Sequence, residues 1–374
     1  MVYRKALKSV KHEKRHTKLD ITNTLVLLAL LTLSCIMVYS ASMIGNKYGI
    51  FTSSVPVETT YFLKRQAIWA VLSFVTFIFI SVAIPFEVFR DKNILQYGFF
   101  AMVILLVIPF ASSSINGARS WIRLGALSFQ PSTLAQLFII IYMAFILETR
   151  KDKLRKVCTS NELINIFWIP LFLIAIIFFQ NDTGMMLITL SVVGIMTLCS
   201  NMHFKNIKRL LTLAVMAIVI VVALLFVKSA FSSGSSYRTN RIKVFLNPFS
   251  EDLSAAADQV INSYIAFGNG GLFGRGLGNS IQKLGYLPEA HTDFILAIIA
   301  EELGLVGVLF VIGLLTALIC RVIIAGTKSR NTFAAMYCIG FASLLVVQSV
   351  VNIGGVTASI PMTGVPLPFV SNGG

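Results

Sequence analysis

The sequence has few charged residues and few cysteines. Only 13% of its 374 residues are Asp, Glu, Lys or Arg, whereas 56% are hydrophobic, and the mean hydropathy is +0.82. A soluble domain of this length needs a larger polar surface, so the composition excludes an ordinary soluble protein. The five cysteines show no CxxC spacing. They therefore support neither a disulfide framework nor a thiolate metal site.

The sequence contains long apolar runs. A helix needs about 20 apolar residues to cross roughly 30 Å of hydrocarbon. Nine runs predict an all-α polytopic membrane protein, with spans at 21–43, 63–84, 94–111, 132–148, 162–179, 183–200, 209–230, 304–325 and 333–353. The first run has the length of a full span behind a long charged segment, so we expect it to remain as an anchor rather than to be cleaved.

Acidic residues are scarce beside basic ones, 16 against 31, which leaves a net charge of +15. The basic residues gather before the first span and in alternate connections, at 150–156, 205–209 and 321–330. This is the positive-inside pattern of membrane proteins, and it argues against nucleic-acid binding. We therefore predict a basic cytoplasmic tail over residues 1–20, which could also contact anionic lipid, and a transmembrane domain over 21–374.

Three outward-facing stretches interrupt the apolar pattern, at 111–130, 231–292 and 354–374. Irregular backbone at membrane depth is tolerated only where it lines a cavity or is buried in protein. The three stretches together predict a site that opens outward, and 231–292 is a long extracellular loop. The chain ends at Ser-Asn-Gly-Gly without a polar tail, which we interpret as a truncation.

An acidic, His-containing cluster precedes the apolar run at residues 295–304. Its members are Glu289, His291 and Asp293. A carboxylate at bilayer depth costs about 3 kcal/mol or more, so such an acid is a functional candidate. If Pro288 begins a helix, Glu289 and Asp293 share a face, and the like charge raises the pKa of Asp293, as suits a general base. The alternatives are an acid favoured by the helix dipole and a pair of ligands for a divalent ion.

Two other outward stretches contain arginines among apolar residues. Arg119, Trp121 and Arg123 lie in NGARSWIRLGALSFQ, where guanidinium groups could bind a phosphate or pyrophosphate. The alternative is an interfacial amphipathic helix whose arginines reach the headgroups. Arg238 and Lys283 make the long loop basic against the positive-inside trend, and an anionic, lipid-linked substrate would explain that charge.

Two further motifs have simpler interpretations. The sequence GGLFGRGLG at 270–278 superficially resembles nucleotide loops, but no strand precedes it and no Walker lysine follows, which favours close-packed turns. Asp182, in a tight turn between two spans, is better explained as a capping residue than as a catalytic one.

Motifs along the whole chain, taken together, resemble the SEDS family of cell-shape and division membrane proteins, the FtsW/RodA type. The matching segments are MVYSAS (37–42), NGARSWIRLG (116–125), FQPS (129–132), QNDTG (180–184), YRTNRI (237–242), GGLFGRGLGNS (270–280), LPEAHTDFI (287–295), EELGLVG (301–307) and TGVPLPFVSNGG (363–374). They occur in the family's order, and no single short motif carries the match.

The resemblance implies a ten-helix fold, of which about nine spans are present and the C-terminal helix is missing. It implies a peptidoglycan glycosyltransferase of the bacterial cytoplasmic membrane that polymerises lipid II on the outer face. The implied partners are a class B penicillin-binding protein, other divisome membrane proteins and membrane lipids. A divalent cation, Mg or Mn, could bridge pyrophosphate and carboxylate.

The family's essential aspartate maps onto Asp293, the expected catalytic base. The candidate substrate-binding residues are Arg119, Trp121, Arg123, Arg238, Lys283, Glu289, His291 and Ser371. The chain departs from the family pattern PSExxK at Thr133 and Gln136, so the usual ion pair is absent while no orphan charge remains.

Several functions remain open from the sequence. MVYSAS and the basic tail favour the division type and the division septum, although an elongation-type polymerase is an alternative. A lipid II flippase and a non-catalytic divisome scaffold are the others. We prefer the enzyme because the acids and the excess positive charge converge on the outward side, and because no internal duplication typical of transporters is evident.

Overall fold

The structure is a computed structural model that describes residues 20–51, 55–111, 119–124, 127–213, 216, 244–249 and 255–372. The predicted tail, Arg238 and most of the predicted span 209–230 lie outside the described residues. Within that span, residues 209–213 and 216 are helical.

Helices form nearly all of the regular structure. The long helices are α2 (Ile21–Lys47), α3 (Tyr61–Ala83), α4 (Lys92–Val107), α5 (Pro131–Thr149), α7 (Ser160–Phe179), α8 (Thr183–Cys199), α11 (Ala255–Gly270), α12 (Ile295–Lys328) and α13 (Thr332–Val356). The short elements are η1 (Phe86–Arg90), η2 (Ile108–Ala111), β1 (Ile122–Leu124), β2 (Leu127–Phe129), α6 (Lys151–Leu154) and η3 (Gln282–Leu284). Residues 204–213 are also helical.

The helical membrane fold is confirmed. In the described part of the chain, seven helices are long and apolar enough to cross a membrane, and α8 is a shorter apolar helix. These eight correspond to eight of the nine predicted spans, with shifted ends. The chain is therefore a multi-pass membrane protein.

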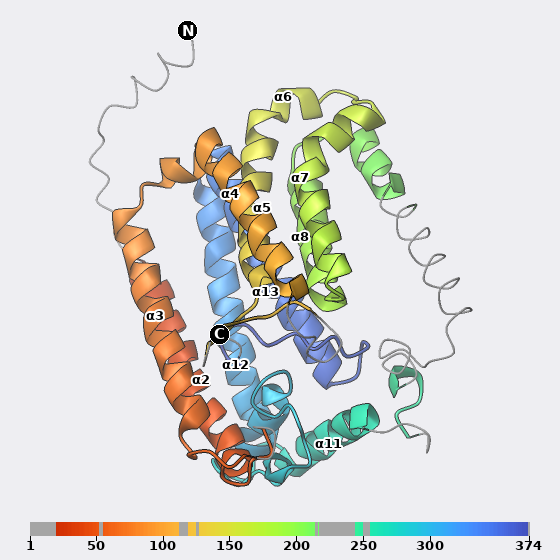
Figure 1. Ribbon diagram of the computed structural model, residues 1–374. Coiled ribbons are helices and arrows are strands. Elements are labelled where there is room, and N and C mark those ends of the chain that lie inside the picture. Colours follow the sequence, from red (N-terminus) through yellow and green to blue (C-terminus); the bar gives the residue numbers. More distant parts are fainter. Residues whose placement is uncertain are drawn as a thin grey trace.

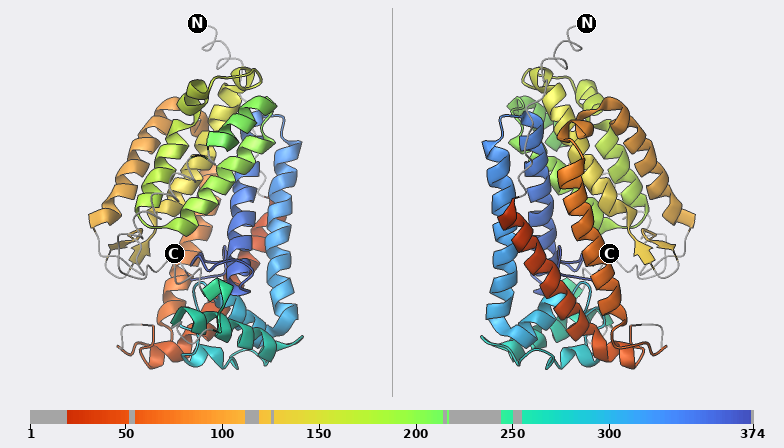
Figure 2. Two further views of the ribbon diagram at one scale, coloured as in Figure 1. Left: turned by 90° about the vertical axis from the view of Figure 1, so that its right-hand side faces the viewer. Right: turned by 90° about the vertical axis from the view of Figure 1, so that its left-hand side faces the viewer.

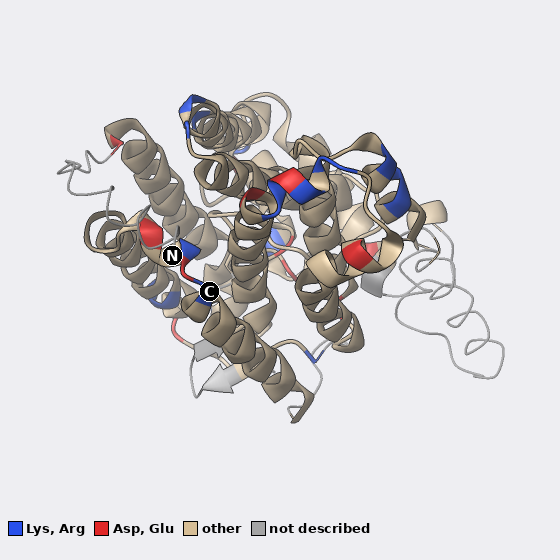
Figure 3. Cartoon of the chain, turned by 90° about the horizontal axis from the view of Figure 1, so that it is seen from above, with Lys and Arg blue, Asp and Glu red and all other residues tan. Residues whose placement is uncertain are grey.

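The spanning helices run up and down between two ends of the molecule (Figure 1). We name these the α6 end and the α11 end after the helices that lie there. The exposed basic residues of the α5–α7 connection lie at the α6 end, which Figure 3 views directly. The group of α4, α5, α7 and α8 stops short of the level that α11 occupies (Figure 2). The α11 end is therefore stepped, and α11 with its following loop covers the lower part.

Side-chain capping sets several of the helix starts. Asp20, Asp91 and Asp182 accept hydrogen bonds from backbone N–H groups in the first turns of α2, α4 and α8. Thr159 and Glu162 form a capping box at the start of α7. These bonds satisfy amides that a helix leaves without a partner at its N-terminus.

Two apolar cores pack on opposite sides of α13. One joins α4, α5, α7, α8 and α13, and the other joins α2, α11, α12 and α13 with residues 287–294. Phe333 and Met336 of α13 belong to the first core, and Leu345 and Val356 to the second. Because α13 serves both cores, it fixes the position of each group of helices relative to the other.

The predicted span 304–325 begins too late. Helix α12 starts at Ile295, and Gly304 interrupts it with φ 69° and ψ −168°, so a fully buried half-helix precedes the kink. The loop after α11 pairs with this break: Arg275 and Gly276 donate their N–H groups to the carbonyls of Glu301 and Glu302 at 2.9 Å. At the break the loop, and not a further helical turn, satisfies the backbone carbonyls of the half-helix.

Candidate active site

Asp293 lies in a turn immediately before α12, and its side chain is partly exposed. The predicted helix from Pro288 is wrong, because residues 288–294 form turns. The Glu289 carbonyl accepts from the amides of Thr292 and Phe294 at 3.2 and 3.1 Å, and the Glu289 carboxylate accepts from the Thr292 hydroxyl at 2.7 Å. These bonds replace the i to i+4 pattern, so Glu289 and Asp293 do not share a helix face.

His291 is enclosed by aromatic rings just before Asp293. The ring centroids of Phe51 and Phe62 lie 4.6 and 4.3 Å from its own, and only 6% of His291 is exposed. Burial lowers the pKa of His291 to about 4, so the imidazole is neutral near pH 7. The sequence predicted a substrate-binding His291, and the structure places it under this aromatic cover.

Asn352 of α13 binds the backbone of the turn that contains Asp293, a role that the sequence analysis did not predict. Its side-chain amide donates to the carbonyl of Asp293 at 2.8 Å and to the carbonyl of Val365 at 2.7 Å. The backbone amide of Asn372 donates to the carbonyl of His291 at 3.0 Å. The turn is therefore attached to α13 and to the C-terminal segment. The only indication in the sequence was the polar residue Asn352 near the end of an apolar run.

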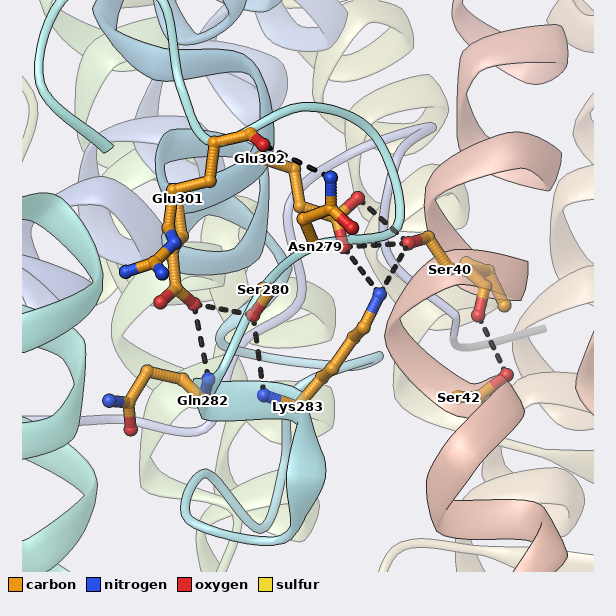
Figure 4. A network of polar contacts seen from close by, with 10 residues as sticks. Ser40, Ser42, Asn279, Ser280, Gln282, Lys283, Glu301 and Glu302 are labelled. Atoms are coloured by element: carbon orange, nitrogen blue, oxygen red, sulfur yellow. Dashed lines mark hydrogen bonds and ion pairs between the residues drawn. The ribbon is translucent and has the colours of Figure 1, made fainter. Parts of the chain in front are cut away.

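Lys283, a predicted substrate-binding residue, lies in the interior. Its side chain is 1% exposed and its ammonium group lies 2.7 Å from a carboxylate oxygen of Glu302, which is fully buried. Ser40 of α2 accepts from the Lys283 ammonium at 3.1 Å and donates to Glu302 at 2.7 Å (Figure 4). A substrate phosphate could contact Lys283 only if Glu302 moved away.

Glu301 is the second fully buried acid of the α12 half-helix. It accepts hydrogen bonds from the Ser280 hydroxyl, from the Asn269 side-chain amide at 3.1 Å and from the Gln282 backbone amide at 3.2 Å (Figure 4). One donor from α11 and two from the loop after it compensate the desolvation of this carboxylate.

Arg123 belongs to a β-hairpin, and Arg119 and Trp121 directly precede its first strand without helical structure, so the amphipathic helix considered as an alternative is wrong for these described residues. Strands β1 and β2 pair antiparallel, with Arg123 opposite Ser128. The Arg119 side chain is exposed, Trp121 is half-buried, and the Arg119 amide donates to the Gln180 carbonyl at 2.8 Å. The hairpin and the Asp293 turn are therefore held by different elements.

Asp182 joins the hairpin to α8. Besides capping α8 through the Met185 amide at 3.2 Å, it accepts from the Gln130 side chain at 2.7 Å and from Ser120. Burial raises the pKa of Asp182 above its usual value, although these donors act against the shift. The predicted capping role is confirmed.

The departures at Thr133 and Gln136 leave no unpaired charge. Gln136 is buried and donates to the Thr189 hydroxyl at 3.1 Å and to the Met185 carbonyl at 3.3 Å. Thr133 is exposed and donates its hydroxyl to the Gln130 carbonyl at 2.8 Å. Both side chains are thus satisfied by neutral polar contacts.

Ser371 accepts from the Leu367 amide at 2.9 Å and lines a largely apolar pocket of about 370 Å³ between α2, α3, α12 and α13. Gln66 lines the same pocket, accepts from the Asn372 side chain at 3.0 Å and donates to Ser34 at 2.7 Å. The predicted Ser371 site therefore lies beside the segment that holds His291.

The described residues contain no group of three or more His, Cys, Asp or Glu side chains that could hold a metal ion. The Mg or Mn ion suggested by the resemblance stays a prediction.

The fold and the site define a class: a polytopic helical membrane protein with a broken helix and an acidic turn at one end. The profile of the FtsW/RodA/SpoVE family, described as "Cell cycle protein", matches residues 21–374. The chain belongs to this family.

Curated relatives agree over nearly the full length. Proteins named "Probable peptidoglycan glycosyltransferase FtsW" from Geobacter sp. (strain M18) and Bacillus subtilis (strain 168) are each 34% identical. The matches cover 94% and 91% of this chain and 91% and 82% of those proteins. The Haemophilus influenzae protein of the same name is 38% identical over 84% of this chain and 77% of its own.

Solved structures show the same fold. The rod shape determining protein RodA of Thermus thermophilus superimposes with a TM-score of 0.62 at 23% identity, covering 95% of this chain and 90% of that one. A chain from the structure described as "Structural coordination of polymerization and crosslinking by a peptidoglycan synthase complex" gives 0.65 at 21% identity, covering 95% and 92%.

Proposed function

We propose that the chain is a peptidoglycan glycosyltransferase that polymerises lipid II at the outer face of the cytoplasmic membrane for septal wall synthesis. The observation that carries this is the position of Asp293, a partly exposed acid in a turn attached to α13 and to the C-terminal segment. The turn lies at the α11 end, away from the basic α6 end (Figure 1). The names of the curated relatives support the activity and the septal role.

In this proposal Asp293 acts as the general base. Its carboxylate takes the proton of the 4-hydroxyl of the acceptor sugar as that oxygen attacks the anomeric carbon of the lipid-linked donor. The bond from that carbon to the pyrophosphate oxygen breaks, and undecaprenyl pyrophosphate leaves with the electron pair. The attachment of the turn through Asn352 favours this chemistry, because a base must be held within hydrogen-bond reach of its proton.

The pyrophosphate groups need cationic ligands, and Arg119, Arg123 and Arg238 are our candidates. Arg119 has the exposed side chain that such a role requires. Trp121, Glu289 and Ser371 are proposed to contact the rest of the substrate, and His291, which Phe51 and Phe62 cover, is proposed to support the turn. A class B penicillin-binding protein is the proposed partner, because a similar fold occurs in a complex that couples polymerization to crosslinking.

The deciding experiment measures lipid II polymerisation by the purified protein with its transpeptidase partner. Asp293→Ala and the isosteric Asp293→Asn should each lower the rate by about 10²-fold or more, because both remove the base. Glu58→Gln is the matched control, since it alters an exposed acid that pairs with Lys64 on the surface. The control should polymerise at the native rate.

Each contrary result has a definite meaning. Equal polymer from the native protein and a folded Asp293→Ala variant would remove Asp293 from the mechanism. No polymer from the native protein, with an active partner and intact lipid II, would favour the flippase or the scaffold, which transport and partner-binding assays then separate.

A further inference from the structure

One ion pair joins the two ends of the segment that contains Asp293. Lys283 lies ten residues before Asp293, and Glu302 lies nine residues after it. The Lys283 ammonium and the Glu302 carboxylate are 2.7 Å apart. The pair therefore joins the ends of the segment 283–302, and Asp293 lies in the middle of it.

A second set of bonds closes the same segment beside the ion pair. Glu301 accepts from the Ser280 hydroxyl and from the Gln282 amide, so the residues before Lys283 contact the residue before Glu302. Ser40 binds both charged groups of the pair and attaches them to α2 (Figure 4). The ends of the segment are thus joined twice, by the ion pair and by the bonds to Glu301, and Ser40 attaches the ion pair to α2.

The burial of this pair indicates that its purpose is not stability alone. Side-chain exposure is 1% for Lys283 and 0% for Glu302, so both groups have lost their hydration. Apolar side chains of similar volume would hold two segments together at least as well as a buried ion pair. An ion pair with a shared hydroxyl adds a defined distance and direction between the two segment ends.

The buried half-helix of α12 connects the ion pair to the turn that contains Asp293. Residues Ile295 to Glu302 form the buried half-helix of α12, and every one of them is buried. A helix rises about 1.5 Å per residue, so a rotation of the half-helix at Glu302 displaces the turn that precedes Ile295. A displacement of about 1 Å at a catalytic group can lower a rate about 100-fold.

We propose that Lys283 and Glu302 are positioning residues that, with Ser40, close the segment 283–302 and hold Asp293 in its catalytic place. The inference rests on the proposed function of Asp293 as the general base. It replaces the expected role of Lys283 as a phosphate ligand, because the ammonium group already donates to Glu302 and Ser40 inside the protein.

A double-mutant cycle tests the proposal. Lys283→Met leaves Glu302 buried without its cation and should lower kcat about 100-fold in the folded protein, with KM within about twofold of native. Lys283→Met combined with Glu302→Gln removes both charges and should recover only part of that loss, because the uncompensated buried charge is gone but the direct contact between the two segment ends is not restored. Lys283→Arg keeps the charge and should retain more activity than Lys283→Met.

The matched control is Lys64→Met, which breaks a Lys–Glu pair of similar length, 2.6 Å, whose side chains are 63% and 61% exposed. It should change neither kcat nor KM, because an exposed pair contributes little. A measurement independent of activity is hydrogen exchange of the amides of residues 287–297, which should lose protection in Lys283→Met and regain only part of it in the double variant.

The outcomes separate the explanations. A raised KM with no recovery in the double variant would overturn the proposal in favour of phosphate binding. A native kcat in the folded fraction of Lys283→Met, with only a lower thermal midpoint, would overturn it in favour of a merely structural pair. If the native protein makes no polymer, the proposed function fails, and unchanged exchange protection in Lys283→Met would overturn the closure itself.

Discussion

The chemistry of the candidate site depends on single side chains whose surroundings differ sharply. Asp293 is partly exposed, whereas His291, two residues earlier, is covered by Phe51 and Phe62. An acid that meets water can exchange protons with a substrate, but an imidazole among aromatic rings resists protonation. The two residues of one short motif therefore have different surroundings: Asp293 reaches solvent, as its proposed role requires, and His291 packs against the rings of Phe51 and Phe62.

His291 leads to a prediction about pH. Its pKa is lowered to about 4 in the folded protein, whereas an unfolded His titrates near 6.5. The unfolded state binds more protons between these values, so stability is complete above about pH 6.5 and falls as the pH decreases towards 4. The loss for this one group is about 2 kcal/mol at pH 5.

Thermal unfolding in detergent between pH 7.5 and pH 5 measures this effect. His291→Gln, which cannot titrate, should show a smaller decrease of the midpoint over that range than the native protein. Equal decreases in both proteins would mean that other groups cause the acid sensitivity and that His291 is not held neutral by its surroundings.

At the scale of elements, the kink in α12 explains the glycines of the preceding loop. A Cβ on Gly274 would lie 2.2 Å from the Glu302 carbonyl oxygen, and one on Gly270 would lie 1.9 Å from that of Ala300. Leu305 and Val306, after the kink, donate their amides to the carbonyls of Gly271 and Leu272. The loop and the broken helix therefore satisfy each other's backbone groups, which needs close contact that only glycine permits.

Two glycines of this loop allow a matched test. Gly274 and Gly278 both have positive φ, 76° and 85°, but a Cβ on Gly278 would meet nothing within 4 Å. Gly278→Ala should cost about 1–2 kcal/mol of backbone strain alone. Gly274→Ala must also separate the loop from the helix and should cost about 3 kcal/mol or more. Thermal midpoints check this, and equal midpoints would show that the loop does not bind the kink as described.

At the scale of the whole molecule, the position of the exposed basic residues indicates how the protein is oriented in the membrane. The α5–α7 connection presents Arg150, Lys151, Lys153, Arg155 and Lys156 as exposed residues at the α6 end (Figure 3). Basic connections stay on the cytoplasmic side during insertion. We therefore expect the α11 end, with Asp293, to face outward, as the proposed polymerisation of lipid II at the outer face requires.

Cysteine labelling tests that orientation. In a background with the five native cysteines replaced, Glu58→Cys should react with a membrane-impermeant maleimide on intact spheroplasts, because Glu58 is exposed at the outward end. Lys153→Cys should react only after permeabilisation. The reverse pattern would place Asp293 in the cytoplasm and would contradict an extracytoplasmic polymerase.

The sequence by itself determined the membrane class, most of the spans, the likeness to a family and the candidate base Asp293. These follow from hydropathy, charge placement and motifs, which are local properties of the chain. Asp182 as a cap also followed from its neighbours alone. Periodicity did not predict the hairpin of β1 and β2 or the turn at 288–294.

Only the tertiary structure decided the roles of Lys283, Glu302 and Asn352. A basic residue in an outward loop is expected to meet solvent or a phosphate, but Lys283 is buried because the chain brings Glu302 and Ser40 to it from two helices. Contacts between residues so far apart in sequence leave no periodic signal. The physical reason is that burial and partnership belong to the packed molecule, whereas composition and spacing belong to the chain.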